Sequence, residues 1–148
     1  MKVKFTEIQK FTQWWVWLIM VFLLALPVYV FLFVGLSDGL KLSPIILMVI
    51  LFYLLKLKIR VDHNGVNMVY FPFVNKFTEW SEVKNVSVIN YGFVGGWGIR
   101  FWTKYGTVYN VRGNKGMLIE LNSGKTFVIG TQKETDLNNV LHDLGKTG

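Results

Sequence analysis

No charged residue occurs between residues 11 and 37, and this uncharged stretch limits what the chain can fold into more than any other feature. As a helix, residues 14–36 are about 34 Å long, enough to cross a hydrocarbon core of about 30 Å. Trp14, Trp15 and Trp17 lie at its N-terminal edge, where membrane proteins place aromatic rings at headgroup level. Core packing of these rings is the alternative. The stretch is far longer than the apolar core of a signal peptide, so we predict a membrane span.

A second apolar segment follows a short connection at residues 37–41. Ser43 and Pro44 are typical of a helix start, with Ser43 as the N-cap and Pro44 in the first turn. The helix that begins there is only about 21 Å long, which is short for a span. Lys41 and Lys56 can extend it, because long basic side chains reach from apolar surroundings to the headgroups.

We therefore predict an anchor over residues 1–57 with two antiparallel spans, at about residues 14–36 and 40–57. A single span followed by an interfacial or re-entrant helix is the alternative. Basic residues cluster beside the two outer ends of this hairpin: Lys2, Lys4, Lys10, Lys56, Lys58 and Arg60. Positive charge marks the cytoplasmic side, which predicts a multi-pass protein of the plasma (inner) membrane with both termini in the cytoplasm.

The chain carries a formal net charge of +7, from 16 Lys and Arg against 9 Asp and Glu. Most of the excess surrounds the anchor, so it indicates contact with membrane lipids and not with nucleic acid. Four basic residues next to the spans are the candidate contacts to lipid headgroups: Lys10, Lys56, Lys58 and Arg60. Anionic headgroups attract such side chains by about 1 kcal/mol each.

From residue 58 onward we predict a separate cytoplasmic domain, residues 58–148. Alternation of apolar and polar residues begins at Leu57 and returns in several short segments separated by turn residues. Strands are expected near residues 57–62, 66–73, 76–80, 86–91, 97–102, 107–111, 117–121 and 125–129. Thr131 and Glu134 fit a capping box, and Leu137, Val140, Leu141 and Leu144 form an apolar stripe after it. The pattern predicts an antiparallel β barrel or sandwich with one C-terminal α-helix.

Strands closed by a single amphipathic helix resemble a pleckstrin-homology (PH) barrel, and the whole chain resembles the small bacterial membrane proteins that carry a bacterial PH domain. The resemblance rests on four segments: Trp80 before residues 81–83, residues 96–100, residues 122–125, and residues 129–132. It implies a fold of the class membrane α plus β, with a PH-like domain behind a transmembrane hairpin. It also implies a binding or scaffolding role.

The sequence contains no complete motif for catalysis, cofactor binding or metal binding. The chain has no cysteine, and His63 and His142 stand in no metal-ligand spacing. Residues 124–126 read Gly-Lys-Thr like the end of a P-loop, but Ile119 stands where the motif needs glycine. We therefore expect no enzyme and no cofactor. We expect a non-catalytic, membrane-tethered interaction or scaffolding module with a protein partner, or alternatively a lipid-contacting module on the anionic inner leaflet.

The candidate partner site is the segment from residue 91 to 102, where four glycines alternate with aromatic residues. Its candidate binding residues are Tyr91, Trp97, Arg100 and Trp102, because aromatic residues and arginine most often anchor partners. Alternation puts Trp97, Ile99 and Phe101 on one face and Arg100 and Trp102 on the other. If the first face is the core face, Arg100 and Trp102 point outward together. The alternative is that the glycines only shape a twisted connection and that Arg100 pairs with Glu120 across the sheet.

Overall fold

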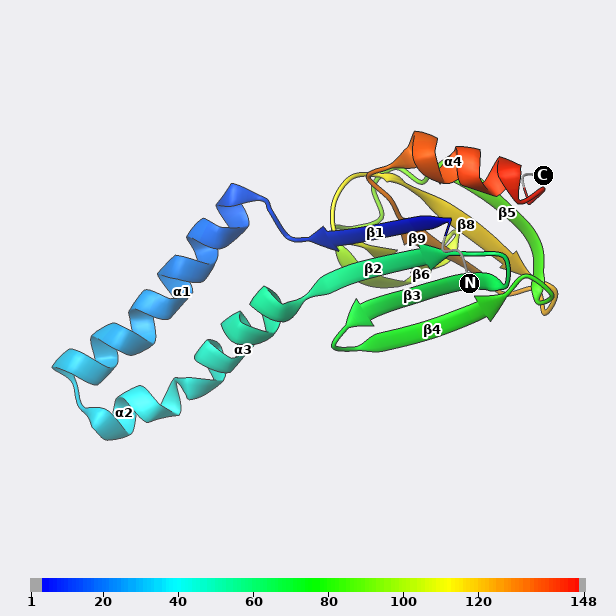
Figure 1. Ribbon diagram of the computed structural model, residues 1–148. Coiled ribbons are helices and arrows are strands. Elements are labelled where there is room, and N and C mark those ends of the chain that lie inside the picture. The colour runs from blue at the N-terminus through cyan, green and yellow to red at the C-terminus, as the bar shows by residue number, and fades with distance from the viewer. Residues whose placement is uncertain (1–3, 147–148) are drawn as a thin grey trace. The chain divides into compact units, whose positions relative to one another are not determined.

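The structure, a computed structural model, describes residues 4–146 and divides into two compact units (Figure 1). The helical unit covers residues 11–55. The β unit takes its residues from both sides of the helical unit, with residues 4–10 before it and residues 56–146 after it. In the chain, the helical unit is therefore an insertion in the β unit.

Three helices make up the helical unit: α1 (Trp14–Phe33), α2 (Leu36–Lys41) and α3 (Ser43–Leu54). Within residues 4–146, α1 is the one helix long and apolar enough to cross a membrane. Gly39 of α2 lies so close to Phe31 of α1 that an added Cβ would be 2.8 Å from the Phe31 Cα. At the other end, the Trp17 ring lies 6.3 Å from that of Phe52 and 5.9 Å from that of Tyr53, measured between centroids. The first turn of α1 and the last turn of α3 are thus neighbours.

The connection predicted at residues 37–41 is itself helical, because α2 begins at Leu36 and ends at Lys41. Ser43 lies inside α3 and does not cap it. The N-cap position is Leu42, and no side chain donates or accepts a capping hydrogen bond there. Pro44 lies in the first turn, as expected from its fixed φ and its missing N–H.

Four antiparallel strands form sheet A in the order β1-β2-β3-β4. Their bounds are β1 Phe5–Lys10, β2 Lys56–Val61, β3 Gly65–Phe71 and β4 Val74–Glu79. β2 and β3 join through a turn at residues 62–64, where Asp62 accepts hydrogen bonds from the N–H groups of Asn64 and Gly65. β3 and β4 join through Pro72 and Phe73, after a cis peptide bond.

Five strands form sheet B in the order β5-β8-β9-β7-β6. Their bounds are β5 Val83–Asn90, β6 Gly98–Thr103, β7 Gly106–Asn110, β8 Lys115–Leu121 and β9 Thr126–Gly130. All neighbouring pairs are antiparallel except β7 and β9, which are parallel. The expectation of a purely antiparallel arrangement is therefore wrong at this one pair. The β6–β7 hairpin inserts between β5 and β8 in sequence and lies at the edge of the sheet.

The core lies between the two sheets and under α4 (Glu134–Asp143). Both sheets contribute alternate side chains that are almost fully buried: Leu57, Ile59, Val61, Val66, Met68, Tyr70, Met117, Ile119 and Ile129. Leu137 and Leu141 of α4 are also fully buried, which confirms the apolar stripe predicted for this helix. The predicted eight strands and the final helix are all present.

β1 was not expected, because residues 1–57 were assigned to the anchor. Its inward side chains are Phe5, Glu7 and Gln9, and two of these three are polar. Ile8, the apolar residue between them, points outward. The apolar face that identifies a strand in a sequence is therefore missing. The β unit begins before the helical unit and continues after it. The predicted boundary at residue 57/58 therefore corresponds to only one of the two junctions between the units.

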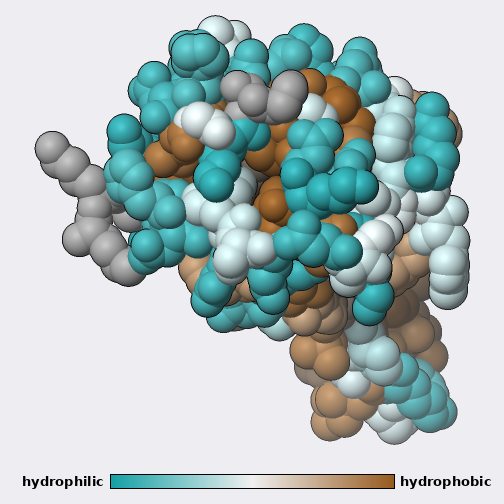
Figure 2. All heavy atoms as spheres, turned by 90° about the vertical axis from the view of Figure 1, so that its right-hand side faces the viewer, coloured by the Kyte–Doolittle hydropathy of each residue, from teal (hydrophilic) through white to brown (hydrophobic). Residues whose placement is uncertain are grey.

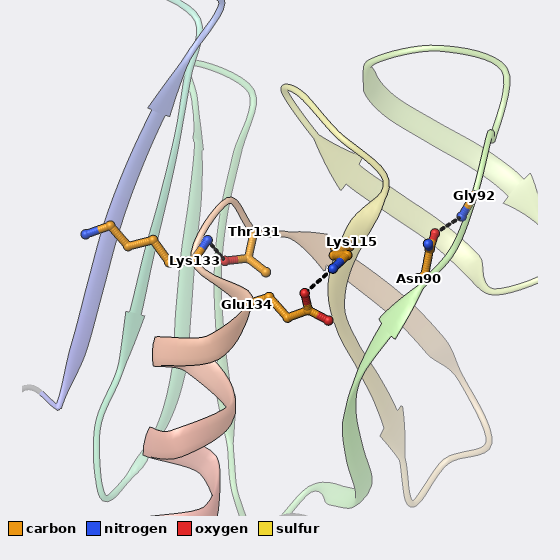
Figure 3. A network of polar contacts seen from close by, with 6 residues as sticks. All are labelled: Asn90, Gly92, Lys115, Thr131, Lys133 and Glu134. Carbon is orange, nitrogen blue, oxygen red and sulfur yellow. Dashed lines mark hydrogen bonds and ion pairs between the residues drawn. The ribbon is translucent and has the colours of Figure 1, made fainter.

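The capping box is also replaced by different contacts. α4 begins at Glu134, its N-cap position is Lys133, and no side chain caps it. Thr131 is buried, and its Oγ1 donates to the Glu7 carboxylate at 2.6 Å and accepts from the Lys133 N–H at 3.0 Å. Glu134 instead pairs with Lys115 of β8 (Figure 3). Thr131 therefore ties β1 to the start of α4.

Candidate functional site

A glycine-rich loop, residues 91–97, joins β5 to β6, and side-chain hydrogen bonds fix both of its ends. The Asn90 carboxamide oxygen accepts from the Gly92 N–H at 3.0 Å (Figure 3). The Asn110 carboxamide oxygen accepts from the Gly98 N–H, also at 3.0 Å. Gly92, Gly95, Gly96 and Gly98 all have positive φ, which other residues adopt only with strain. The glycines are thus required for the path of the loop, as the alternative interpretation held.

Tyr91 is not available to a partner, because its side chain is only 3% exposed. It packs with Val108 and Val128 in the core of sheet B. Its hydroxyl donates to the Gly113 carbonyl at 3.2 Å and accepts from the Asn110 Nδ2 at 3.1 Å. Burial raises the pKa of the Tyr91 phenol, and the hydrogen bond from Asn110 partly opposes that rise. The prediction of Tyr91 as a binding residue is therefore wrong, since it holds the loop in place instead.

Arg100 and Trp97 contact each other across the start of β6. The Arg100 Nη2 donates to the Trp97 carbonyl at 3.0 Å. Its guanidinium covers Gly96, where an added Cβ would lie 2.6 Å from Nη2. The Arg100 Nε is buried and has no hydrogen-bond partner among the described residues. The Trp97 side chain is about one-third exposed.

Arg100 does not pair with Glu120. It lies on β6 opposite Val108, whereas Glu120 lies on β8 opposite Asn85 and Thr126. β9 and β7 separate the two strands in sheet B. That part of the alternative interpretation is wrong.

Phe101 and Trp102 form an exposed aromatic pair on the edge strand β6. Trp102 is 97% exposed, as predicted for an outward position, and Phe101 is 59% exposed although alternation placed it in the core. The pairing register shifts between Arg100 and Thr103, and Trp102 has a φ of 56°. This irregularity breaks the alternation and turns both rings outward. Their centroids are 5.9 Å apart.

An open hollow of about 350 Å³ adjoins the loop. Its lining residues are Gly92, Phe93, Val94, Gly96, Trp97, Asn110, Gly113 and Asn114. Phe93 stands beside it with 89% of its side chain exposed, so the loop adds a further aromatic residue to the surface. A second hollow of about 190 Å³ shares Gly113 and Asn114 and reaches the Lys115–Glu134 ion pair. Phe93 lies in the segment predicted as the partner site but was not among its candidate binding residues. An aromatic residue surrounded by glycines could have indicated an exposed side chain at this position.

The four candidate lipid contacts lie together on the outward face of sheet A. Lys10 is directly opposite Lys56, and Lys58 and Arg60 follow at alternate positions of β2. Phe71, the neighbour of Lys56 on β3, belongs to the same face, with its ring 5.2 Å from the Lys56 Nζ. The structure thus brings all four predicted residues onto one surface, together with exposed apolar residues that the sequence analysis did not single out.

Within residues 4–146, no three His, Cys, Asp or Glu side chains gather in a group that could hold a metal ion. No protein-family model matches the chain, and no curated protein or solved structure matches it either.

Proposed function

We propose that this chain is a non-catalytic interaction module that α1 anchors in the plasma (inner) membrane, and that it binds a protein partner at β6 and the loop before it. The observation that carries the proposal is Trp102, which is 97% exposed and has a positive φ. A non-glycine residue in the left-handed region costs about 1–2 kcal/mol. Because the indole is fully exposed in the free protein, burial of apolar surface does not offset this backbone cost.

Strained backbone and exposed aromatic side chains occur together where a protein meets a ligand. Trp102 and Phe101 stand on an edge strand, Phe93 stands on the adjoining loop, and Arg100 lies beside them on the same strand. Aromatic and arginine side chains supply most of the binding energy in protein interfaces. The hollow beside Trp97 offers a pocket for an anchoring side chain of the partner.

The helical unit is the membrane anchor in this proposal, and it crosses the membrane twice. β1 pairs with β2 along its whole length, from Phe5 opposite Val61 to Lys10 opposite Lys56. Paired strands lie on one side of a membrane, so the chain between them crosses an even number of times. If α1 crosses, the segment formed by α2 and α3 returns. The basic residues at the outer ends support a cytoplasmic location for both termini.

We further propose that the β unit is a PH-like domain of the bacterial type. The succession of a four-stranded sheet, a second sheet and one final helix supports this assignment. The role that the resemblance implies is binding or scaffolding, which agrees with an exposed aromatic strand. Contact with lipids of the anionic inner leaflet is the second candidate function, because all four basic candidates share one face of sheet A.

Site-specific crosslinking tests the partner proposal, because the chain has no native cysteine. A photoreactive label on Phe93→Cys in the full-length protein should crosslink one protein in native membranes. The same label on Ser123→Cys, in the exposed β8–β9 turn, serves as the control. Adding Trp102→Asn should abolish the crosslink, since asparagine tolerates positive φ but removes the indole. Adding Phe77→Ala, an exposed aromatic of sheet A, should leave it unchanged.

An identical crosslinking pattern at residues 93 and 123 would overturn the proposal. So would a folded Trp102→Asn protein that keeps the crosslink at full yield.

A further inference from the structure

The outward face of sheet A is basic and apolar. Its side chains alternate with the core residues along each strand, and they are Thr6, Ile8, Lys10, Lys56, Lys58, Arg60, Asn67, Val69, Phe71, Asn75, Phe77 and Glu79. Four of them are cations. The one carboxylate among them, Glu79, is opposite Gly65 at one end of the sheet. Lys10, Lys56 and Phe71 are in register at the other end.

We call this second end the basic-aromatic corner, defined as Lys10, Lys56, Phe71, Pro72 and Phe73. Phe73, in the β3–β4 turn, is 62% exposed, and Phe71 is 40% exposed. An ammonium beside aromatic rings combines the two residue types that membrane proteins place at the headgroup level. Of these five residues, only Lys10 and Lys56 were predicted from the sequence as lipid contacts.

Chain connectivity keeps this corner close to the helical unit, whatever the orientation of that unit. Trp14 of α1 follows Lys10 by four positions in the chain, which limits their Cα distance to about 14 Å. Lys56 follows Leu54 of α3 by two residues, a reach of about 7 Å. The turn at residues 62–64 is at the opposite end of sheet A, about 20 Å away along a seven-residue strand. Figure 2 shows the β unit from the side of that far end, where hydrophilic residues cover most of the surface.

We propose that the basic-aromatic corner rests in the headgroup region of the bilayer that α1 enters, with Phe73 at the interface and Lys10 and Lys56 on anionic lipids. The inference rests on the proposed membrane anchoring. It adds a second attachment, by which the β unit is held against the surface of the membrane. The covalent closeness of the corner to α1 and its local charge favour a lipid surface over a protein as the occupant.

Depth-sensitive labelling of the full-length protein tests this. Phe73→Cys and His63→Cys each supply a single cysteine in an exposed turn, at opposite ends of sheet A. Each is labelled with an environment-sensitive fluorophore and reconstituted in nanodiscs that contain a headgroup nitroxide lipid. We expect a blue-shifted emission and several-fold stronger quenching at residue 73 than at residue 63. In discs with anionic lipid, Lys10→Gln with Lys56→Gln should reduce the quenching at residue 73.

Equal quenching at the two positions would overturn the proposal, and so would quenching at residue 73 that does not depend on the two lysines. A protein that fails to enter nanodiscs would instead reject the membrane anchoring itself. The crosslink at residue 93 is measured separately, so neither result depends on the partner proposed for β6.

Discussion

Tyr70 links the two sheets of the β unit through its hydroxyl. The side chain points inward from β3 of sheet A, and the phenol donates to the Asn110 carbonyl of β7 at 3.3 Å. Burial raises the pKa of Tyr70 to about 12, and the nearby Arg100 charge opposes part of that rise. The link therefore requires the neutral phenol, and it joins the core to the residue that supports the proposed binding strand.

Tyr70 predicts how stability depends on alkaline pH. Because its pKa is higher in the folded chain than the ordinary 10, the neutral phenol stabilises the fold fully below about pH 10. This contribution, about 2 kcal/mol, is lost as the pH rises towards 12. The free energy of unfolding, measured at about every half pH unit between pH 9 and 12, should fall more steeply for the natural protein than for Tyr70→Phe. Parallel curves for the two proteins would contradict the assignment.

Thr131 predicts a second effect of a single residue. Thr131→Ala removes the hydroxyl that donates to the buried Glu7 carboxylate, and it should cost about 1–3 kcal/mol of unfolding free energy. Thr131→Ser keeps the hydroxyl and should retain most of the stability. Chemical denaturation of the detergent-solubilised proteins measures both. A loss as large for serine as for alanine would show that the methyl group and not the hydroxyl matters.

Single residues were predictable where burial follows alternation and not where a local irregularity intervenes. Trp102 points outward as its position suggested, but Phe101 does so too, because the register shift in β6 interrupts the pattern. Tyr91 carries the same aromatic signal as Trp102 and is buried. Only the two hydrogen bonds to its hydroxyl distinguish it, and both partners are distant in sequence.

Among the elements, α4 was predictable from its apolar stripe, whereas β1 was not. Leu137 and Leu141 repeat with the helical period and are buried without a specific partner. Glu7 and Gln9 are buried only because Thr131, Gln132 and Gly130 supply hydrogen-bond partners. The spacing of apolar residues predicts which apolar side chains are buried. It does not predict the burial of a polar side chain, which depends on a particular hydrogen-bond partner.

The position of β1 predicts that the helical unit can be removed without loss of the β unit. Lys10 and Lys56 are the last register pair, so an Asn-Gly turn in place of residues 11–55 closes a two-residue hairpin. We expect a soluble, cooperatively folded protein, measured by near-ultraviolet circular dichroism and thermal melting. A matched chain that starts at Leu57 lacks β1 and should melt lower or aggregate, because it exposes the edge of β2. Equal melting of the two would show that β1 contributes nothing.

For the whole molecule, the pairing of β1 with β2 predicts a strict topology. A cysteine at Ser37, in α2, should react with a membrane-impermeant maleimide in intact cells. A cysteine at Ser123, in the β unit, should react only after the membrane is permeabilised. Reaction at both positions, or at neither, would contradict a helical unit that crosses twice.

The charge pattern alone predicts that both ends of the helical unit lie on one side of the membrane, because cations flank each apolar segment. The backbone pairing of strands on either side of the insertion is a second reason for this prediction, which the charge pattern does not contain. Pairing between distant segments leaves little trace in composition. The sequence therefore predicted a leading anchor and a following domain, although the β unit takes residues from both sides of the helical unit.

The interrupted β unit has a consequence for how the protein is made. During translation β1 leaves the ribosome first, and it waits several seconds for its neighbour, at a synthesis rate of about 5–20 residues per second. Its buried Glu7 finds Thr131 later still, 124 positions further along the chain. In the proposed anchoring, the apolar helices enter the membrane during this interval. A chain inserted with the wrong topology could not bring β1 beside β2, and it would keep the unpaired strand edge of β2 exposed. Under that proposal, completion of sheet A would depend on correct membrane insertion.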